Sequence, residues 1–509
     1  MNTDTIAKQK MTRYRWVITA LLFFATTINY LDRQVLSLTW KDFIVPEFHW
    51  TDSDYGTITG WFSIFYAVGL LLAGRFVDWL DTKKGFLWAI GIWSVGAVLH
   101  AFCGIATSGI ITGNWFVSFE GAKEALATVN DVSRVMTVSV SLFIFARFVL
   151  AIGEAGNFPA AIKTTAEYFP KKDRAYSTSI FNAGATVGAL LAPVSIPFIA
   201  KAYGWEMAFI IIGALGFIWM GFWIFMYKKP EANPKVNAAE LAYIQQDDAD
   251  EKTQTADASQ EKKKGVPFLK LFSYKQTWAF AVGKFMTDGV WWFFLFWTPA
   301  YLSSVYGLDS TQSAPQIFVL YLITLLSIIG GWLPTYFVDK KGMNPYAGRM
   351  RSMLIFAFFP LLTLLAQPLG HISVWIPVII IGIAGAAHQA WSANIFSTVG
   401  DMFPKKAIAT ITGIGGMAGG LGSFVINKGS GVLFDAAKGT TMVDGKETVM
   451  TKELLEQGAQ FIKQPIELFG FRGIESGYFI IFCICGVAYL IGWIIMKTLV
   501  PKYKVITDL

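Results

Sequence analysis

Residues 74–85 read GRFVDWLDTKKG, and residues 331–342 read GWLPTYFVDKKG. Each stretch follows a long apolar run and begins with glycine. Each also carries an aspartate, Asp78 or Asp339, ahead of two lysines and a final glycine. The copies occupy corresponding places, after the second apolar run of each half of the chain. A pattern repeated at matched positions predicts that the two halves are similar structural units.

The amino-acid composition indicates whether these units are surrounded by water or by lipid. Hydrophobic residues make up 54% of the 509 residues, and charged residues make up 15%. Mean hydropathy is +0.48, and soluble domains usually carry about 25% charged residues. A water-soluble chain of several domains is therefore excluded, and we expect an all-α membrane protein.

Twelve apolar runs are long enough to cross a bilayer as helices, since about 20 residues span its core. They cover residues 16–38, 54–73, 86–106, 137–158, 177–200, 206–227, 277–304, 315–337, 351–367, 373–398, 408–433 and 474–499. A polar segment divides them into two sets of six. We therefore predict an N-terminal six-helix half (1–227), a central loop (228–275) and a C-terminal six-helix half (276–509).

Charge placement gives the expected orientation. The chain has 42 Lys and Arg against 35 Asp and Glu, and most basic residues fall in loops on the side of the N-terminus. The positive-inside rule then puts both termini and the central loop in the cytoplasm. The basic residues do not form one face, so nucleic acid is not an expected partner. Three cysteines in apolar runs predict neither a disulfide framework nor a metal site.

The repeated loop motif has two interpretations. Asp78 and Asp339 could each form an ion pair at a cytoplasmic helix end, as a conformational latch that breaks when the halves move. Alternatively, both are solvated loop residues. Glycine strings at 184–188 and 413–420 lie inside predicted spans, where small residues let helices approach closely.

Twelve spans, a long central loop and the repeated motif resemble the major facilitator superfamily. Asn29-Tyr30-Leu31-Asp32-Arg33 and residues 153–160 (GEAGNFPA) resemble its anion:cation symporter branch. Residues 166–170 (AEYFP), 181–184 (FNAG), 204–210 (GWEMAFI) and 387–390 (AHQA) are similar to bacterial hexuronate permeases. The resemblance implies a bacterial inner-membrane transporter for glucuronate or galacturonate, without cofactors. We expect protons, the sugar acid and the lipid bilayer as its partners, and a monomer.

Charged residues inside the first half are costly to insert and are therefore candidates for function. Asp32 and Arg33 are adjacent, so their side chains point about 100° apart on a helix. Arg147 and Glu154 share one helix face, with Glu154 about 10 Å nearer the cytoplasm. We expect Asp32 to pair with Arg147, which leaves Arg33 for a substrate carboxylate and Glu154 unpaired as a proton carrier.

The resemblance implies the same roles for Asp32, Arg33 and Glu154. Some hexuronate permeases have a neutral residue at the position of Asp32, so Asp32 could be structural instead. A static ion-pair network is the alternative for all four charges.

The second half and the flanking spans contribute further candidates. Lys284 and Asp288 lie at i, i+4 and could form a second anchor, or Lys284 could only reach toward the interface. The remaining candidates could line the site or simply pack between helices: Tyr66, Asn182, Trp291, Trp292, His388 and Gln389. Trp297 and Tyr301 fall where an interfacial aromatic belt is expected.

Several functions remain open at this point. A symporter or exchanger of another organic anion, such as galactonate, is the nearest alternative to hexuronate symport. A membrane enzyme lacks a nucleophile–base pair or metal cluster in the sequence, and a sensor lacks an attached signalling domain. Two long outer connections, 108–135 and 436–473, could form a rim over the cavity or be independent loops, with 452–462 as the best helical candidate.

Overall fold

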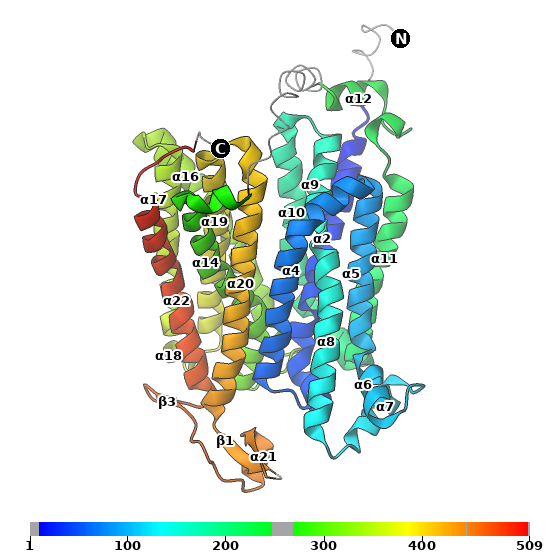
Figure 1. Cartoon of the computed structure of the whole chain (residues 1–509), viewed down its shortest axis with the longest axis vertical. Helices are drawn as coiled ribbons and strands as arrows, with labels where there is room; N and C mark the ends of the chain where they lie inside the picture. The colour runs from blue at the N-terminus through cyan, green and yellow to red at the C-terminus, as the bar shows by residue number, and fades with distance from the viewer. Residues whose placement is uncertain (1–9, 247–267, 444, 507–509) are drawn as a thin grey trace.

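The computed structural model describes residues 10–246, 268–443 and 445–506. The first bundle of helices runs from α2 to α11, and the second runs from α14 to α22. The two bundles stand side by side (Figure 1).

The elements of the first bundle follow in chain order. They are α2 (Tyr14–Thr39), a π-helical turn (Trp40–Ile44), α3 (Val45–Phe48), α4 (Asp52–Leu80), α5 (Thr82–Ala101), α6 (Cys103–Thr112), α7 (Phe119–Ala127), α8 (Val132–Glu154), α9 (Asn157–Tyr168), α10 (Lys171–Tyr203) and α11 (Trp205–Met226). A short turn (Pro230–Ala232), α12 (Ala238–Ile244) and a second short turn (Phe268–Ser273) connect the bundles.

The elements of the second bundle also follow in chain order. It contains α14 (Lys275–Tyr306), α15 (Ala314–Thr324), a turn (Leu325–Ile328), α16 (Ile329–Lys341), α17 (Pro345–Phe358), a turn (Phe359–Leu365), α18 (Ala366–Gly370), α19 (Trp375–Met402), α20 (Lys405–Lys438) and α22 (Ile474–Leu499).

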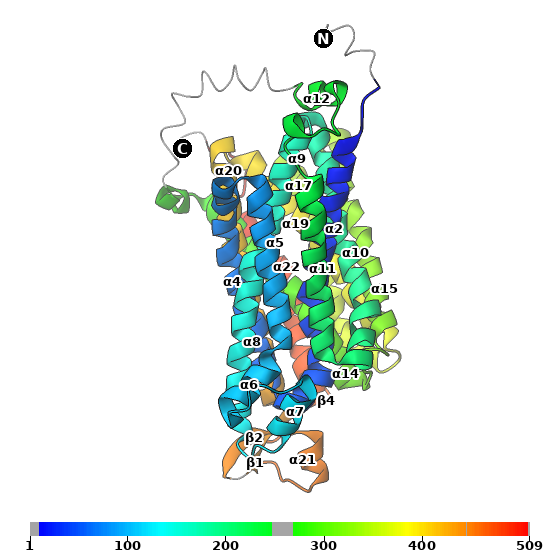
Figure 2. The same cartoon turned by 90° about the vertical axis from the view of Figure 1, so that its right-hand side faces the viewer.

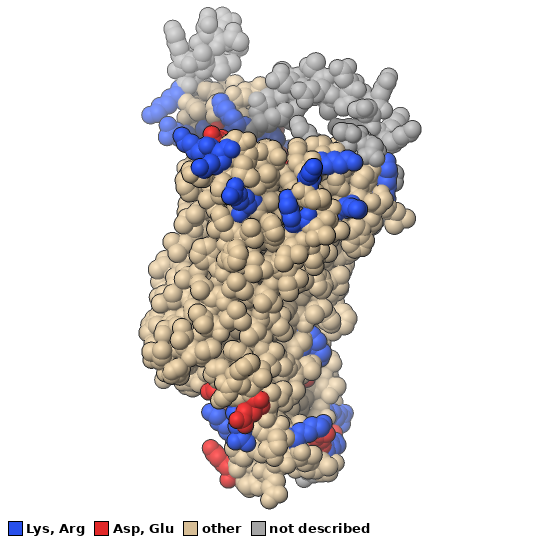
Figure 3. All heavy atoms as spheres, turned by 90° about the vertical axis from the view of Figure 1, so that its left-hand side faces the viewer, with Lys and Arg blue, Asp and Glu red and all other residues tan. Residues whose placement is uncertain are grey.

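Nine helical segments of the described residues are long and apolar enough to cross a membrane. The predicted spans 16–38, 277–304 and 408–433 correspond to α2, α14 and α20. These helices are 26, 32 and 34 residues long, and each is therefore longer than the roughly 20 residues that a helix needs to cross the bilayer core. Figure 3 shows a wide band without charged side chains between two charged ends. The prediction of an all-α membrane protein is confirmed.

The two ends of the molecule differ. One end, here called the terminal face, carries α12 and both chain ends (Figure 1). The opposite end, the insertion face, carries the segments between α6 and α8 and between α20 and α22. The second of these contains four short strands, β1 (Thr440–Val443), β2 (Lys446–Val449), β3 (Glu467–Leu468) and β4 (Phe471–Arg472). β1 pairs with β2 and β3 with β4, both antiparallel.

The helix predicted over 452–462 is therefore mostly wrong, because α21 covers only Lys452–Glu456. Gly458 follows with a φ of +85°, which ends a helix readily.

Glycines allow the closest helix contacts, as predicted for the two strings. A Cβ on Gly184 of α10 would lie 2.3 Å from the carbonyl oxygen of Phe23 on α2. A Cβ on Gly420 of α20 would lie 2.4 Å from the Ala67 Cβ on α4. The α4–α20 contact joins the two bundles, so small side chains at this seam determine how closely they approach.

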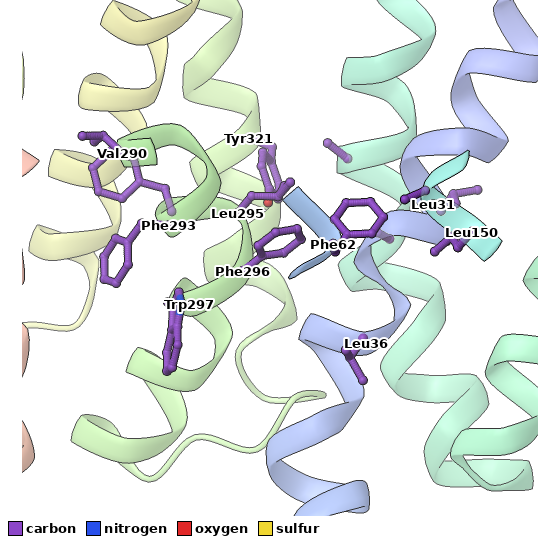
Figure 4. Close-up of a cluster of buried hydrophobic side chains, with 14 of the residues drawn as sticks. Leu31, Leu36, Phe62, Leu150, Val290, Phe293, Leu295, Phe296, Trp297 and Tyr321 are labelled. Atoms are coloured by element: carbon purple, nitrogen blue, oxygen red, sulfur yellow. The ribbon is translucent and has the colours of Figure 1, made fainter. Parts of the chain in front are cut away.

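Aromatic side chains fill the space between the bundles toward the insertion face. Phe62 of α4 meets Phe296 of α14 with ring centroids 6.1 Å apart (Figure 4). Trp297 packs edge-on against Tyr55 at 5.0 Å, and its indole N–H donates to Asn427 Oδ1 at 3.0 Å. Trp297 is 0% exposed and Tyr301 is 1% exposed. Both are core residues that do not face lipid, so their placement in an interfacial belt is wrong.

Candidate functional site

A buried ion pair between Arg33 and Glu154 joins α2 to α8 of the first bundle. Arg33 on α2 donates from Nε and Nη2 to Glu154 Oε2 on α8, at 2.9 and 2.7 Å. Glu154 is fully buried and Arg33 is 4% exposed. A charge-assisted pair removed from water in this way is strong, and breaking it leaves a costly buried charge. The expectation that Glu154 is unpaired and Arg33 free is therefore wrong.

The other two charges of the first bundle are also buried, and neither forms an ion pair with a described residue. Asp32 and Arg147 are each 1% exposed. Within the described part of the chain, no hydrogen bond reaches either carboxylate oxygen of Asp32 or any guanidinium nitrogen of Arg147. The predicted Asp32–Arg147 pair is therefore not formed. The Arg147 guanidinium instead lies 5.1 Å from the ring centroid of Phe62.

Aromatic rings surround the Arg33 guanidinium and form what we call the aromatic cage. The distances from Arg33 Cζ to the ring centroids are 4.6 Å for Tyr66, 5.0 Å for Tyr30, 5.1 Å for Trp292 and 5.8 Å for Phe62. The faces of these rings attract the cation. Trp292 belongs to α14, so the cage takes residues from both bundles.

The second bundle contains a buried ion pair of its own, between Lys284 and Asp288. Lys284 Nζ lies 2.7 Å from Asp288 Oδ2, one turn along α14. The ammonium group also sits 4.2 Å from the ring centroid of Phe396 on α19. Because the Lys284 side chain is only 5% exposed, the interpretation that it reaches toward the interface does not hold.

His388 is held between two aromatic residues. Its ring stacks on Trp291 of α14, with centroids 5.4 Å apart and an interplanar angle of 3°. His388 Nδ1 lies 2.7 Å from the Tyr489 hydroxyl of α22, which donates in turn to the Thr287 carbonyl at 3.3 Å. These contacts fix the orientation of His388 and Trp291 together.

The remaining candidates are placed differently. Tyr66 contributes to the cage. Asn182 is exposed on α10, and Gln389 is half-buried on α19. Neither is joined by a described polar contact to the charged residues, so their roles stay predictions. Tyr30, Phe62, Phe396 and Tyr489 were missed by the sequence analysis, because an aromatic residue in an apolar run has no distinguishing spacing.

Hydrogen bonds between the bundles gather at the insertion face, in a set of residues we call the insertion-face lock. Asp52 at the start of α4 accepts from Lys41 at 3.0 Å and from Lys438 of α20. Asp435 of α20 accepts from the backbone N–H groups of Asp52 and Ser53, at 3.1 and 2.8 Å. A carboxylate at a helix N-terminus is stabilised by its free N–H groups. The lock therefore holds the bundles together at this face.

The predicted latch at the opposite face is only partly visible. The side chain of Asp78 lies outside the described residues. Asp339 is exposed and belongs to none of the described ion pairs, among which Arg349–Asp401 at 2.7 Å joins α17 to α19. The latch stays a prediction.

No group of three or more His, Cys, Asp or Glu could hold a metal ion within the part of the chain that the structure describes. The site is thus made of paired and unpaired charges among aromatic rings, between two bundles of membrane-crossing helices. Charged residues enclosed among membrane-crossing helices of two bundles are typical of membrane transporters.

The chain belongs to the Major Facilitator Superfamily, whose model matches residues 22–426. The relatives of this chain in the family are transporters, and the chain is not an enzyme.

Several relatives of the chain are named as transporters of sugar acids. The chain is 28% identical over 433 residues to the hexuronate transporter of Escherichia coli K12, covering 84% of this chain and 89% of that protein. It is 26% identical over 341 residues to the galacturonate transporter of Dickeya chrysanthemi, covering 67% and 87%. It is 24% identical over 434 residues to a probable galactarate/D-glucarate transporter of E. coli K12, covering 84% and 89%.

Solved structures share the fold. A bacterial homolog of the human lysosomal transporter Spinster aligns with a TM-score of 0.62 at 18% identity, covering 96% of this chain and 97% of that one. A D-xylose-proton symporter aligns with a TM-score of 0.62 at 16% identity, covering 97% and 100%.

Proposed function

We propose that the protein imports a sugar-acid anion, a hexuronate such as glucuronate or galacturonate, by proton symport. The observation that carries the proposal is the Arg33–Glu154 pair, buried inside the aromatic cage. The pair holds one cation that suits a carboxylate and one carboxyl group that can take a proton. The similarity to transporters of hexuronate and galacturonate supports the substrate class.

Coupling follows from competition for one guanidinium. While Glu154 is ionised, it occupies both Arg33 nitrogens that face it. Protonation removes the negative charge from Glu154 and weakens both hydrogen bonds. The carboxylate of the substrate then replaces Glu154 on Arg33, so proton and anion enter together. Asp32 serves as a second proton-coupling residue, and Arg147 as the cation beside it.

The sugar part of the substrate would use the second bundle. Trp292 belongs to the cage. Trp291 precedes it on α14 and stacks on His388 of α19. An aromatic face suits the C–H surface of a sugar ring, and His388 and Gln389 suit its hydroxyls. Lys284 and Asp288 form the anchor of the second half.

Alternating access would use the two predicted halves, residues 1–227 and 276–509, with 228–275 between them. We assign the terminal face, and therefore both termini, to the cytoplasm of a bacterial inner membrane. The insertion-face lock then closes the periplasmic side in this conformation. A monomer contains the complete site.

A second candidate is symport or exchange of another sugar acid, such as an aldonate like galactonate. A probable galactarate/D-glucarate transporter supports this candidate, because its match covers the same shares of both chains as the match to the hexuronate transporter. Arg33 recognises the carboxylate that all these acids share, so the aromatic and hydroxyl contacts must distinguish them.

Uptake by proteoliposomes distinguishes the candidates. Labelled glucuronate should accumulate when the outside is acidified, and unlabelled galacturonate should compete better than galactonate or galactarate. Equal uptake with and without the pH gradient would overturn symport. Stronger competition by galactonate or galactarate would favour the second candidate.

A further inference from the structure

An apolar groove runs along the outside of the first bundle between α2 and α11. Its volume is about 440 Å³. The two helices lie side by side (Figure 2), and Tyr14 at the start of α2 donates from its hydroxyl to the Met226 carbonyl at 2.9 Å. This bond closes the groove at the terminal face.

Both helices contribute a regular stripe to the groove. On α2 the stripe runs from Val17 to Ile28, and on α11 it runs from Leu215 to Met226. Phe24 and Phe222 project from the two stripes and are 55% and 56% exposed. Eleven residues of helix are about 16 Å long, which matches half of a bilayer core about 30 Å thick. The groove thus has the depth of one leaflet.

The described residues that line the groove are apolar, and the one indole N–H among them, that of Trp219, has a partner. Trp219 is 3% exposed, and its indole N–H donates to the Leu21 carbonyl at 2.8 Å. The ring therefore offers only an apolar surface. A groove of this length and lining fits a hydrocarbon chain better than it fits a polar ligand.

Basic side chains stand at the terminal end of the groove. Arg13 precedes α2, Lys228 follows α11, and Lys235 lies 5.5 Å from the ring centroid of Tyr14. All three are exposed. Basic residues at the level of the head groups attract anionic lipids.

We propose that this groove is a binding site for an anionic phospholipid. One acyl chain lies on Trp219 between the two stripes, and the phosphate meets Arg13, Lys228 and Lys235. Placing the lipid in the leaflet on the cytoplasmic side rests on the proposed orientation, whereas the groove and its basic end do not.

Native mass spectrometry of the purified full chain tests the proposal, with palmitoyl-oleoyl phosphatidylglycerol and the matching phosphatidylcholine as probes. The wild-type protein should retain more phosphatidylglycerol than phosphatidylcholine. Removing one basic residue, as in Lys235→Gln, should weaken phosphatidylglycerol binding about fivefold. Ala20→Trp fills the groove and should reduce binding of both lipids.

Matched controls keep the outcome interpretable. Lys201→Gln removes an exposed lysine near the C-terminal end of α10, which does not line the groove. Leu191→Trp adds a ring at an exposed site on the same helix, also outside the groove. Neither should change retention. Equal retention of the two lipids by the wild-type protein would overturn the proposal, as would unchanged binding in Lys235→Gln or Ala20→Trp. The measurement requires no transport, so it fails or succeeds independently of the proposed function.

Discussion

At the residue scale, the proposed function depends on the shape of the Arg33 side chain. Arg33→Lys keeps the charge but loses the planar group that donates twice to one carboxylate. We expect affinity for the sugar acid to fall at least about tenfold while folding changes little. A thermal-shift titration measures it, with exposed Arg134→Lys as the matched control. Unchanged affinity would place the carboxylate anchor elsewhere, with Lys284 as the first candidate.

A second residue, Glu47 of α3, predicts a pH dependence of stability. Burial raises the pKa of the Glu47 carboxyl to about 7, although the Trp205 indole N–H donates to it at 2.9 Å and opposes the rise. Because the folded-state pKa lies above the unfolded value near 4.3, protonated Glu47 contributes stability that is complete below about pH 4.3. That stability is lost as pH rises through about 7.

Glu47→Gln should remove this pH dependence, which is worth up to about 4 kcal/mol of unfolding free energy. Thermal unfolding midpoints between those two pH values measure the effect. Exposed Glu453→Gln should keep the wild-type slope. A slope that Glu47→Gln leaves intact would show that other groups cause it.

The residue scale also shows what the sequence could not predict. The four charges of the first bundle were found because buried charges are rare in apolar runs. Their pairing was wrong, because adjacent Asp32 and Arg33 point in different directions and only the rotation of α2 decides which one meets α8. That rotation is determined by the glycine contacts with α10, which bring Gly188 against Thr27.

At the element scale, the contact between α4 and α20 should control closure of the insertion face. A Cβ on Gly56 would lie 2.5 Å from the Asn427 carbonyl oxygen, whereas a Cβ on Gly74 of the same helix meets nothing within 4 Å. Gly56→Val should therefore separate the bundles at this face, and Gly74→Val should not. Spin labels on Glu120→Cys and Glu453→Cys measure the distance by pulsed electron resonance. Equal distance distributions in both variants would contradict this role of the α4–α20 seam.

Helices formed by long apolar runs could be predicted from the sequence. Features that depend on contacts between residues far apart in the chain could not. Length and hydropathy sufficed for the membrane-crossing helices. The insertion-face lock was missed, because Asp52 and Lys438 are 386 positions apart and each is an ordinary charged residue at a helix end. The strands after α20 were missed as well, because the charged pattern of that segment resembled a short amphipathic helix.

At the scale of the whole molecule, we expect the terminal face to lie in the cytoplasm and the insertion face outside it. Glu120 and Glu453 are both exposed at the insertion face. In a background without the three native cysteines, Glu120→Cys and Glu453→Cys should react with an impermeant maleimide added to whole spheroplasts. A cysteine at Lys340, on the terminal face, should react only after the membrane is opened. The reverse pattern would invert the proposed topology.

The central claim is that one buried ion pair couples the proton to the sugar acid. Glu154→Gln keeps the size of the side chain but removes its charge and its proton. In proteoliposomes, we predict that this variant exchanges labelled for unlabelled glucuronate at equilibrium, yet does not accumulate it when the outside is acidified. Wild-type protein should do both, and a pH-sensitive dye inside the vesicles should report proton entry only for the wild type. Full accumulation with proton entry by Glu154→Gln would contradict the account.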